Sequence, residues 1–298
     1  MDRRKDARSE SIDLPQGLYY DARSFYCRVQ TARMESTSLM RTVFRQMWEY
    51  RHLMLSMAMV IVRARYRRTA LGMLWSLLGP VALVLSIGAV YGQIIGRPFS
   101  TFVPFLFGGL FSYRFITSVA GGGCTAFINA QGYVKQIAVP LVVYPGRLVL
   151  ANFIDFLLSF GSLSMLLFVI QVFHPSSLIT ALPGLVILLV FGLGLGLFQA
   201  IVGTIFRDYQ HITSIFFQLM FYVTPILYPP EIMDNFGRSW IYLYNPLYYV
   251  ITCIRQPFLT GQFPPVQTLG IAAAVALIAL GLGTYVLGRV GRSVVMHL

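Results

Sequence analysis

The segment Thr69–Gly96 is 28 residues long and contains no charged side chain. An α-helix advances by about 1.5 Å per residue, so about 20 apolar residues are enough to cross the hydrocarbon core of a bilayer, which is about 30 Å thick. The segment is therefore predicted to form a transmembrane helix. Pro80 lies inside it and is expected to kink the helix.

Apolar runs of similar length recur towards the C-terminus. Of the 298 residues, 56% are hydrophobic and 11% are charged, whereas soluble domains carry about 25% charged residues. In the fourth run, Gly192, Gly194 and Gly196 are typical of a helix that a neighbour approaches closely. The predicted fold is an all-α integral membrane protein. We expect six transmembrane helices, at Thr69–Gly96, Phe102–Ile128, Tyr144–Phe173, Leu178–Phe206, Ile212–Tyr228 and Thr268–Leu287.

The charged residues are concentrated before the first span. Residues 1–68 hold 14 of the 23 Lys and Arg and 7 of the 11 Asp and Glu. Residues 1–38 show no apolar periodicity and are predicted to be a mobile cytoplasmic extension. Residues 39–68 carry a helical pattern whose apolar run is too short to cross a membrane. We expect an amphipathic helix at the cytoplasmic interface there, followed by a transmembrane domain over residues 69–298.

A longer segment, residues 229–265, separates the fifth and sixth predicted spans. Asn245 followed by Pro246 is typical of a helix N-cap with proline at the first helical position. The helix that follows, Leu247–Thr260, ends at Gly261 and is too short to cross. The sequence therefore predicts short re-entrant or interfacial helices in this segment.

The distribution of Lys and Arg predicts the orientation. With the N-terminus inside, cytoplasmic segments hold 18 of the 23 Lys and Arg and outer loops hold three, as the positive-inside rule requires. Both termini are then cytoplasmic and residues 229–265 face the outside. The net charge of +12 is explained by cytoplasmic residues that flank the spans, so we expect no nucleic-acid partner.

Catalytic and nucleotide-binding motifs are missing from the sequence. No G-x-x-x-x-G-K-[ST] pattern occurs, and the only lysines are Lys5 and Lys135. The chain therefore lacks the loop that cradles ATP phosphates. No H-E-x-x-H pattern or other metal-ligand spacing occurs either. The pattern favours a transport subunit over an enzyme, with no cofactor and no metal of its own.

Four stretches, taken in order, resemble type-2 ABC exporter permeases of the O-antigen, capsule and teichoic-acid branch. The resemblance implies a homodimer that works with two copies of a separate ATPase, which binds ATP and Mg. It also implies a lipid-linked polysaccharide as substrate, export across the bacterial inner membrane, and membrane lipids as neighbours. The four stretches are Arg63–Pro80, Tyr133–Asn152, Phe191–Ile212, and Pro225–Pro230 together with Asn245–Leu247.

The resemblance places a coupling helix for the ATPase in the loop Asn129–Pro140. A second candidate contact is the turn at Arg207 and Asp208, although these two residues can also simply cap the spans and balance each other's charge. The candidate coupling residues are Asn129, Tyr133, Lys135, Gln136, Arg207 and Asp208.

Aromatic residues gather around the fifth span and the outer segment. Tyrosine and tryptophan offer an apolar face for a sugar ring and a polar tip for its hydroxyls. The alternative is the aromatic belt found at any membrane interface. The candidates for the substrate path are Tyr222, Tyr228, Trp240, Tyr244, Tyr248 and Tyr249, with Arg114.

A basic run precedes the first span. It is predicted to bind anionic lipid headgroups or the pyrophosphate of the substrate, with ordinary membrane anchoring as the alternative. Its members are Arg63, Arg65, Arg67 and Arg68.

Two charged residues fall inside predicted spans, Arg114 in the second and Asp155 in the third. A charge at the bilayer centre costs about 2.5–3.5 kcal/mol on insertion scales, so each needs a partner or water. Both are expected near mid-depth on neighbouring antiparallel helices, which predicts an Arg114–Asp155 ion pair. The alternative is that Arg114 lines the translocation cavity and contacts the phosphate or sugars of the substrate.

Two further functions stay open at this point. One is an exporter of the same fold that carries a drug or a small lipid. The other is a membrane-embedded enzyme that modifies glycans.

Overall fold

A computed structural model of the chain describes residues 39–67, 75–132 and 139–297. The predictions for residues 1–38, and for Arg68, Tyr133, Lys135 and Gln136, lie outside these residues. Residues Leu39–Leu298 form one compact unit.

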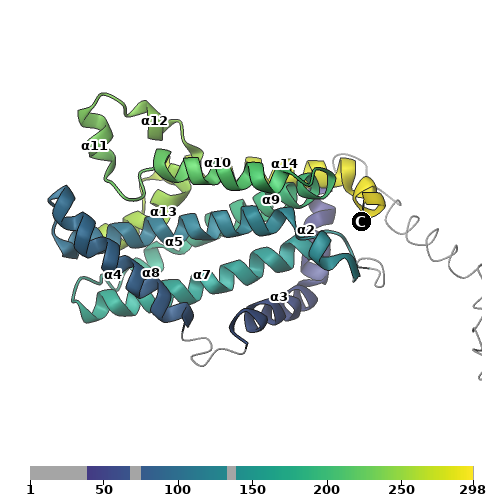
Figure 1. Cartoon of the computed structure of the whole chain (residues 1–298), viewed down its shortest axis with the longest axis horizontal. Coiled ribbons are helices and arrows are strands. Elements are labelled where there is room, and N and C mark those ends of the chain that lie inside the picture. The colour runs from purple at the N-terminus through teal and green to yellow at the C-terminus, as the bar shows by residue number, and fades with distance from the viewer. Residues whose placement is uncertain (1–38, 68–74, 133–138, 298) are drawn as a thin grey trace, which may run out of the picture. The chain divides into compact units, whose positions relative to one another are not determined.

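The secondary structure of the described residues is helical, with no strand among them (Figure 1). The helices are α2 (Leu39–Glu49), α3 (Arg51–Tyr66), α4 (Trp75–Ile95), α5 (Phe99–Cys124), η2 (Ile128–Ala130), α7 (Val143–Val169), α8 (Ser177–Thr180), α9 (Leu182–Ile205), α10 (Tyr209–Val223), α11 (Pro230–Asn235), α12 (Trp240–Leu243), α13 (Pro246–Thr260) and α14 (Val266–His297). The prediction of an all-α integral membrane protein is confirmed.

Five helical segments among the described residues are long and apolar enough to cross a membrane. They correspond to the predicted first, second, third, fourth and sixth spans. The predicted fifth span is α10, which has 15 residues and is therefore only about 22 Å long. It ends at Val223 because Pro225 disfavours a helical conformation at Thr224, whose backbone is extended. The five segments are Leu78–Ile95, Phe99–Cys124, Val143–Val169, Ser177–Ile205 and Val266–Gly291.

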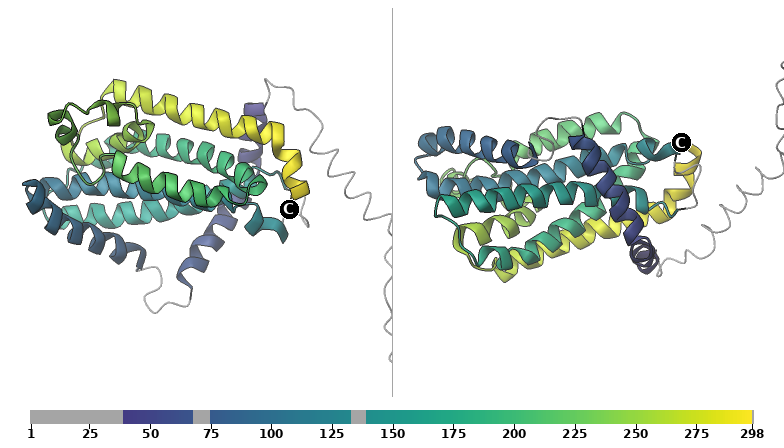
Figure 2. Two further views of the ribbon diagram at one scale, coloured as in Figure 1. Left: turned by 45° about the horizontal axis from the view of Figure 1, so that its top comes forward. Right: turned by 90° about the horizontal axis from the view of Figure 1, so that it is seen from below.

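The long helices run lengthwise beside one another, with α5 the most buried of them and α4 the least (Figure 1). Helix α14 lies along α9 (Figure 2). Their backbones approach closely at Gly194, where a Cβ atom would lie 2.3 Å from the backbone of Ala279 and Leu280. The close approach predicted for the glycines of the fourth span is thus confirmed at Gly194.

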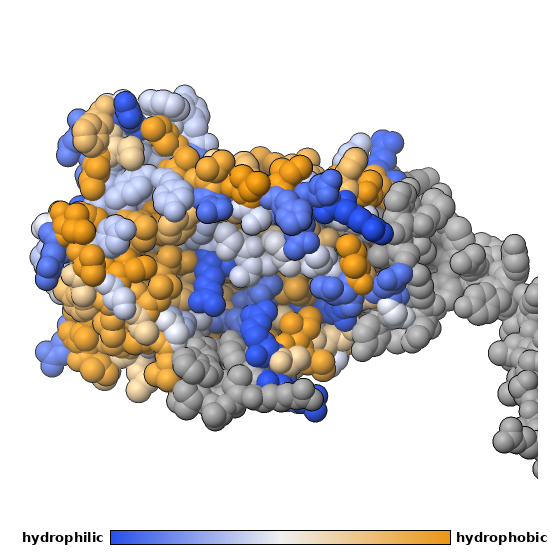
Figure 3. Space-filling model, viewed as in Figure 1, coloured by the Kyte–Doolittle hydropathy of each residue, from blue (hydrophilic) through white to orange (hydrophobic). Residues whose placement is uncertain are grey.

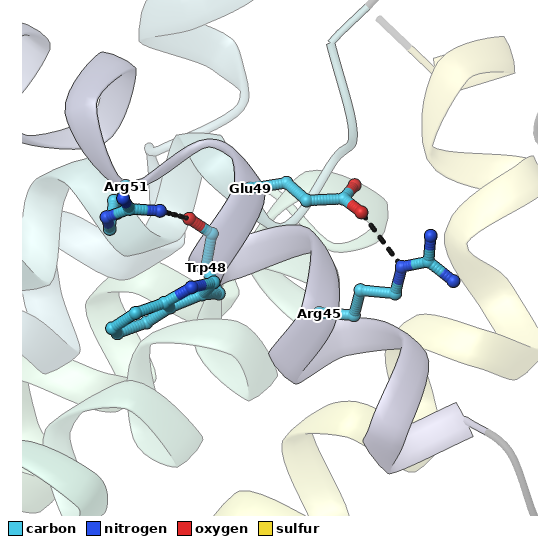
Figure 4. A network of polar contacts seen from close by, with 4 residues as sticks. All are labelled: Arg45, Trp48, Glu49 and Arg51. Atoms are coloured by element: carbon cyan, nitrogen blue, oxygen red, sulfur yellow. Dashed lines mark hydrogen bonds and ion pairs between the residues drawn. The ribbon is translucent and has the colours of Figure 1, made fainter.

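The predicted interface helix consists of two helices that run in different directions (Figure 2). The break falls at Tyr50, whose ψ of 14° departs from helical geometry. Figure 4 shows the polar contacts around the break, where Arg45 pairs with Glu49 at 2.8 Å and Arg51 donates to the Trp48 carbonyl at 2.8 Å. The single periodic pattern concealed this break because both halves are apolar on one side.

Helix α3 packs along α7 rather than lying alone at the interface. Its buried side chains, Met54, Ala58 and Val62, are spaced four residues apart and so form one stripe. Met54 lies at the N-terminal start of α7, close to Gly146. Because the stripe continues along α3, the C-terminal end of this helix is carried towards the middle of α7.

The outer segment contains three short helices, α11, α12 and α13, at one end of the unit (Figure 1). The Asn245 side chain accepts a hydrogen bond from the Leu247 amide at 3.0 Å. Gly261 ends α13 with a φ of 68°, in the left-handed region that favours glycine. Both predicted ends of this helix are confirmed.

Asn245 also connects α13 to the unwound end of α10, because its Nδ2 donates to Thr224 Oγ1 at 2.7 Å. We expect Asn245→Ala to lower the unfolding free energy by about 1–2 kcal/mol, the usual cost of losing an N-cap. The measurement is the melting temperature of the purified protein in detergent. Asn245→Asp is the matched control, since it keeps the capping oxygen and replaces the amide that donates to Thr224. An unchanged melting temperature for Asn245→Ala would show that the cap contributes nothing.

Candidate functional site

A cavity of about 260 Å³ lies between α3, α4, α5 and α7, and we call it the α3–α7 cavity. Its polar side chains come from three helices, and its apolar lining is aromatic. Figure 3 shows hydrophilic side chains gathered over α5, α7 and α3, within an otherwise largely apolar face. The lining residues are Arg65, Gly79, Pro80, Phe111, Arg114, Phe115, Ser118, Asn152, Asp155, Phe156 and Ser159.

The ion pair in this cavity joins Asp155 to Arg65 of α3. Arg65 also donates to Asn152 Oδ1 at 3.3 Å. The Asp155 side chain is 15% exposed and that of Arg65 is 44% exposed. The structure thus gives Asp155 a different partner from the predicted Arg114, because α3 packs along α7 and brings Arg65 to the depth of Asp155.

Arg114 lines the same cavity and has an exposed side chain. The ion pairs of the described residues include Arg45, Arg65 and Arg97 but not Arg114. Two of the predicted residues, Arg114 and Asp155, therefore share one cavity without forming the predicted pair. The alternative, that Arg114 lines the translocation cavity, stays a prediction.

A second, larger hollow of about 670 Å³ runs between α5 and α10, and we call it the α5–α10 groove. Helix α5 is fastened to α10 across it by Tyr113, whose buried hydroxyl donates to the Phe217 carbonyl. The groove combines aromatic rings with hydroxyl and amide groups. Its lining residues are Leu83, Leu110, Tyr113, Arg114, Thr117, Gly121, Gln210, Thr213, Ser214, Phe217, Gln218, Phe221 and Tyr222.

Sequence reasoning missed the polar residues of this groove. Gln210, Ser214 and Gln218 are spaced four residues apart on α10, so they form a polar stripe on an otherwise apolar helix. That spacing is the signal present in the sequence, and the apolar residues between these three obscure it.

The aromatic candidates divide into two sets. Tyr222 lines the groove and is 65% exposed, and the hydroxyl of Tyr228 donates to the Tyr222 carbonyl at 2.9 Å. The others belong to the outer helices α12 and α13 or the turn between them, where they lie outside the lining of the groove. These are Trp240 and Tyr244, which are exposed, and Tyr248 and Tyr249, which are half-buried.

The outer segment is held together by aromatic and polar contacts. The rings of Tyr242 and Tyr248 lie 4.8 Å apart between centroids. Burial, together with the hydrogen bond that Tyr242 donates to Asp234 at 2.7 Å, raises the pKa of the Tyr242 hydroxyl. Glu231 of α11 pairs with Arg97 in the turn between α4 and α5 at 3.2 Å. Of these contacts, the exposed Arg97–Glu231 pair is the one that joins the segment to the turn between α4 and α5.

The candidate coupling residues that the structure describes lie at helix ends. Asn129 is exposed in η2, and its side chain donates to Thr125 Oγ1 at 3.2 Å. Arg207 and Asp208 are exposed in the turn between α9 and α10, and no ion pair joins them among those of the described residues.

Within the basic run, the structure distinguishes Arg65 from its neighbours. Arg63 and Arg67 are exposed, and neither is among the lining residues of the α3–α7 cavity. Of the described members of the run, Arg65 lines this cavity and forms an ion pair with the Asp155 carboxylate.

Comparisons with known proteins agree with this architecture. The chain is 30% identical over 238 residues to the O-antigen export system permease protein RfbA of Myxococcus xanthus, covering 79% of this chain and 91% of that protein. It is 28% identical over 201 residues to an RfbA of Klebsiella pneumoniae, covering 67% and 77%. It is 25% identical over 231 residues to the polysialic acid transport protein KpsM of Escherichia coli, covering 74% and 87%.

These relatives are permease and transport proteins, and the apolar helices of this chain suit a multi-pass membrane protein. The model of the ABC-2 type transporter family matches residues 52–259, which is more than half of the chain. The chain therefore belongs to the ABC-2 type transporter family.

Proposed function

We propose that this chain is the transmembrane permease subunit of an ATP-driven exporter that moves a lipid-linked polysaccharide across the bacterial inner membrane. The observation that carries the proposal is the α5–α10 groove, which combines aromatic and hydrogen-bonding side chains along a membrane helix. The names of the relatives, which refer to O-antigen export and polysialic acid transport, support the same class of cargo.

The lining of the groove suits a glycan chemically. Sugar rings stack on flat aromatic faces such as Phe221 and Tyr222, while amides and hydroxyls such as Gln218 and Ser214 exchange hydrogen bonds with sugar hydroxyls. Arg114 is the one charged residue in the described lining. A mostly uncharged lining allows a long polar chain to slide, because no single contact holds it strongly.

The transporter is proposed to be a homodimer, in which a second copy covers the open side of the groove. Helix α10 has only two buried residues, Thr213 and Phe217. Several large apolar side chains of α10 are exposed in the single chain and would be covered by lipid or by the second copy. They include Ile212, Ile215, Phe216 and Leu219.

Energy is proposed to come from two copies of a separate ATPase, which bind ATP and Mg, because this sequence lacks a phosphate-cradling loop. The family to which the chain belongs implies such a partner. Both termini are proposed to be cytoplasmic, so that the loop Asn129–Pro140 and the turn at Arg207 and Asp208 face the ATPase.

The groove provides the test of this function. We expect Gln218→Leu and Tyr222→Ala each to reduce ATP-dependent transfer of a lipid-linked polysaccharide into vesicles by about fivefold, the effect of losing about 1 kcal/mol of contact. The assay uses the chain reconstituted together with its ATPase. Tyr285→Ala is the matched control, since Tyr285 is an exposed tyrosine of α14 outside the groove. Wild-type transfer by both groove variants would exclude the groove as the path of the glycan.

A further inference from the structure

Arg114 has an unusual position, because it lines both the α3–α7 cavity and the α5–α10 groove. The two hollows meet beside α4. Gly79 and Pro80 of α4 line the cavity, and Leu83, one helical turn further on, lines the groove. One turn of α4 therefore lies next to both, and Arg114 is the charged residue that the two linings share.

The described lining of the α3–α7 cavity carries two arginines and one aspartate, so it has a net charge of one positive unit. The Asp155 carboxylate is engaged by Arg65, whereas Arg114 forms no ion pair among the described residues. Ser118, Ser159 and Asn152 add hydrogen-bonding groups. A guanidinium binds phosphate through two parallel hydrogen bonds.

The remaining lining of the cavity is apolar. Phe111, Phe115 and Phe156 form an aromatic wall beside the polar groups. Asp155 lies 12 residues after the start of α7, or about 18 Å along its axis. A hollow at this depth, with a net positive charge and an aromatic wall, suits a ligand that combines a phosphate with a hydrocarbon chain.

The groove lacks the counter-charge that the cavity contains. Its described lining includes no acidic residue, and Arg114 is its only charged one. A phosphate that moves from the cavity into the groove therefore leaves Arg65 and Asp155 behind but stays within reach of Arg114.

Helix α4 borders both hollows, through Gly79 and Pro80 on one side and Leu83 on the other. It is the least buried of the long helices. Pro80 removes one of its backbone hydrogen bonds at the level of the cavity. Its low overall burial and this proline make α4 easier to displace than α5 at the level of the cavity.

We propose that Arg114 receives the phosphate of a lipid in the α3–α7 cavity and keeps hold of it as it passes into the α5–α10 groove. Asp155 limits how tightly the cavity retains that phosphate by neutralising Arg65. The transfer role rests on the proposed function, since it requires a lipid-linked cargo. The phosphate chemistry is shared by two sources, the diphosphate of a lipid-linked glycan and the headgroup of an ordinary anionic phospholipid.

The test uses the complex of this chain with its ATPase, reconstituted in phosphatidylcholine nanodiscs. Binding of a polyprenyl diphosphate is measured, with the uncharged polyprenol as a control ligand and phosphatidylglycerol as a competitor. We expect Arg114→Gln to weaken diphosphate binding by about 10-fold to 100-fold, as for the loss of hydrogen bonds to a charged group. Arg114→Lys should restore part of the affinity. Arg289→Gln, an exposed arginine of α14 outside both hollows, is the matched control.

Asp155→Asn provides a second readout that a purely structural role would not produce. It raises the net charge of the cavity, so diphosphate binding should tighten several-fold while export slows, because the cargo is released less readily. Polyprenol binding should be the same in all variants. Folding of each variant is checked by elution of the intact complex, and Arg114→Lys keeps the test decisive where Arg114→Gln fails to assemble.

The outcomes separate this proposal from the proposed function. Wild-type diphosphate binding and export by Arg114→Gln would overturn the role of Arg114 and leave the exporter assignment intact. Displacement of the diphosphate by phosphatidylglycerol at equal concentration would overturn the transfer role, since the site would then hold ordinary phospholipid. Arg114-dependent diphosphate binding by a complex that exports no glycan would support the phosphate site and contradict the proposed function.

Discussion

Gly194→Ala is expected to prevent α9 and α14 from packing together. The added Cβ atom would lie 2.3 Å from the Ala279 carbonyl carbon and 2.3 Å from the Leu280 nitrogen. These are backbone atoms, so the clash cannot be relieved by a change of side-chain rotamer. Overpacking usually costs about 1–3 kcal/mol when side chains can adjust, and we expect this site to exceed that range because two helices must separate.

The measurement is the fraction of protein that elutes as a single species from detergent, followed by its melting temperature. Gly270→Ala is the matched control, since Gly270 lies in α14 and a Cβ atom there meets nothing within 4 Å. Alanine is the better helix former by about 1 kcal/mol, so this control should be at least as stable as the wild type. A Gly194→Ala protein with wild-type elution and melting would refute the close packing of α9 and α14.

The second large effect is expected at the ion pair of the α3–α7 cavity. Asp155→Asn leaves Arg65 without its carboxylate in a partly buried site. Removing one partner of a fully buried pair costs about 3–5 kcal/mol. Because the Arg65 side chain is 44% exposed and water screens it, we expect a smaller loss of about 1–3 kcal/mol.

A double-mutant cycle identifies the partner of Asp155. The melting temperatures of Asp155→Asn, Arg65→Gln and the double variant are compared, and the double variant should recover part of the summed loss. The same cycle with Arg114→Gln is the control and should be additive. Coupling of Asp155 to Arg114 in place of Arg65 would restore the pair that the sequence suggested and contradict the packing of α3 on α7.

The parts of the fold that could be predicted are those determined by residues close together in the sequence. Apolar runs of sufficient length identify spans without any knowledge of packing, and the ends of α13 follow from Asn245, Pro246 and Gly261. The break at Tyr50 could not be predicted, because residues on both sides of it continue one apolar pattern. The early end of α10 was signalled by Pro225 but was outweighed by the apolar residues that follow it.

The candidate site was only partly predictable, for a different reason. The energetic cost of charge in lipid was enough to single out Arg114 and Asp155. Choosing the partner of Asp155 required the position of α3, which depends on contacts between residues nearly a hundred positions apart, such as Arg65 and Asn152. Such contacts leave no periodic trace in a single sequence.

The length of α10 has a consequence for the membrane itself. At 15 residues the helix is about 22 Å long, against a hydrocarbon core of about 30 Å. The unwound residues that follow it, Thr224, Pro225 and Ile226, are buried in protein, which shields their backbone groups from lipid. A helix this short is expected to be accommodated by local thinning of the adjacent bilayer. Local bilayer thickness is thereby part of the environment to which this fold is matched.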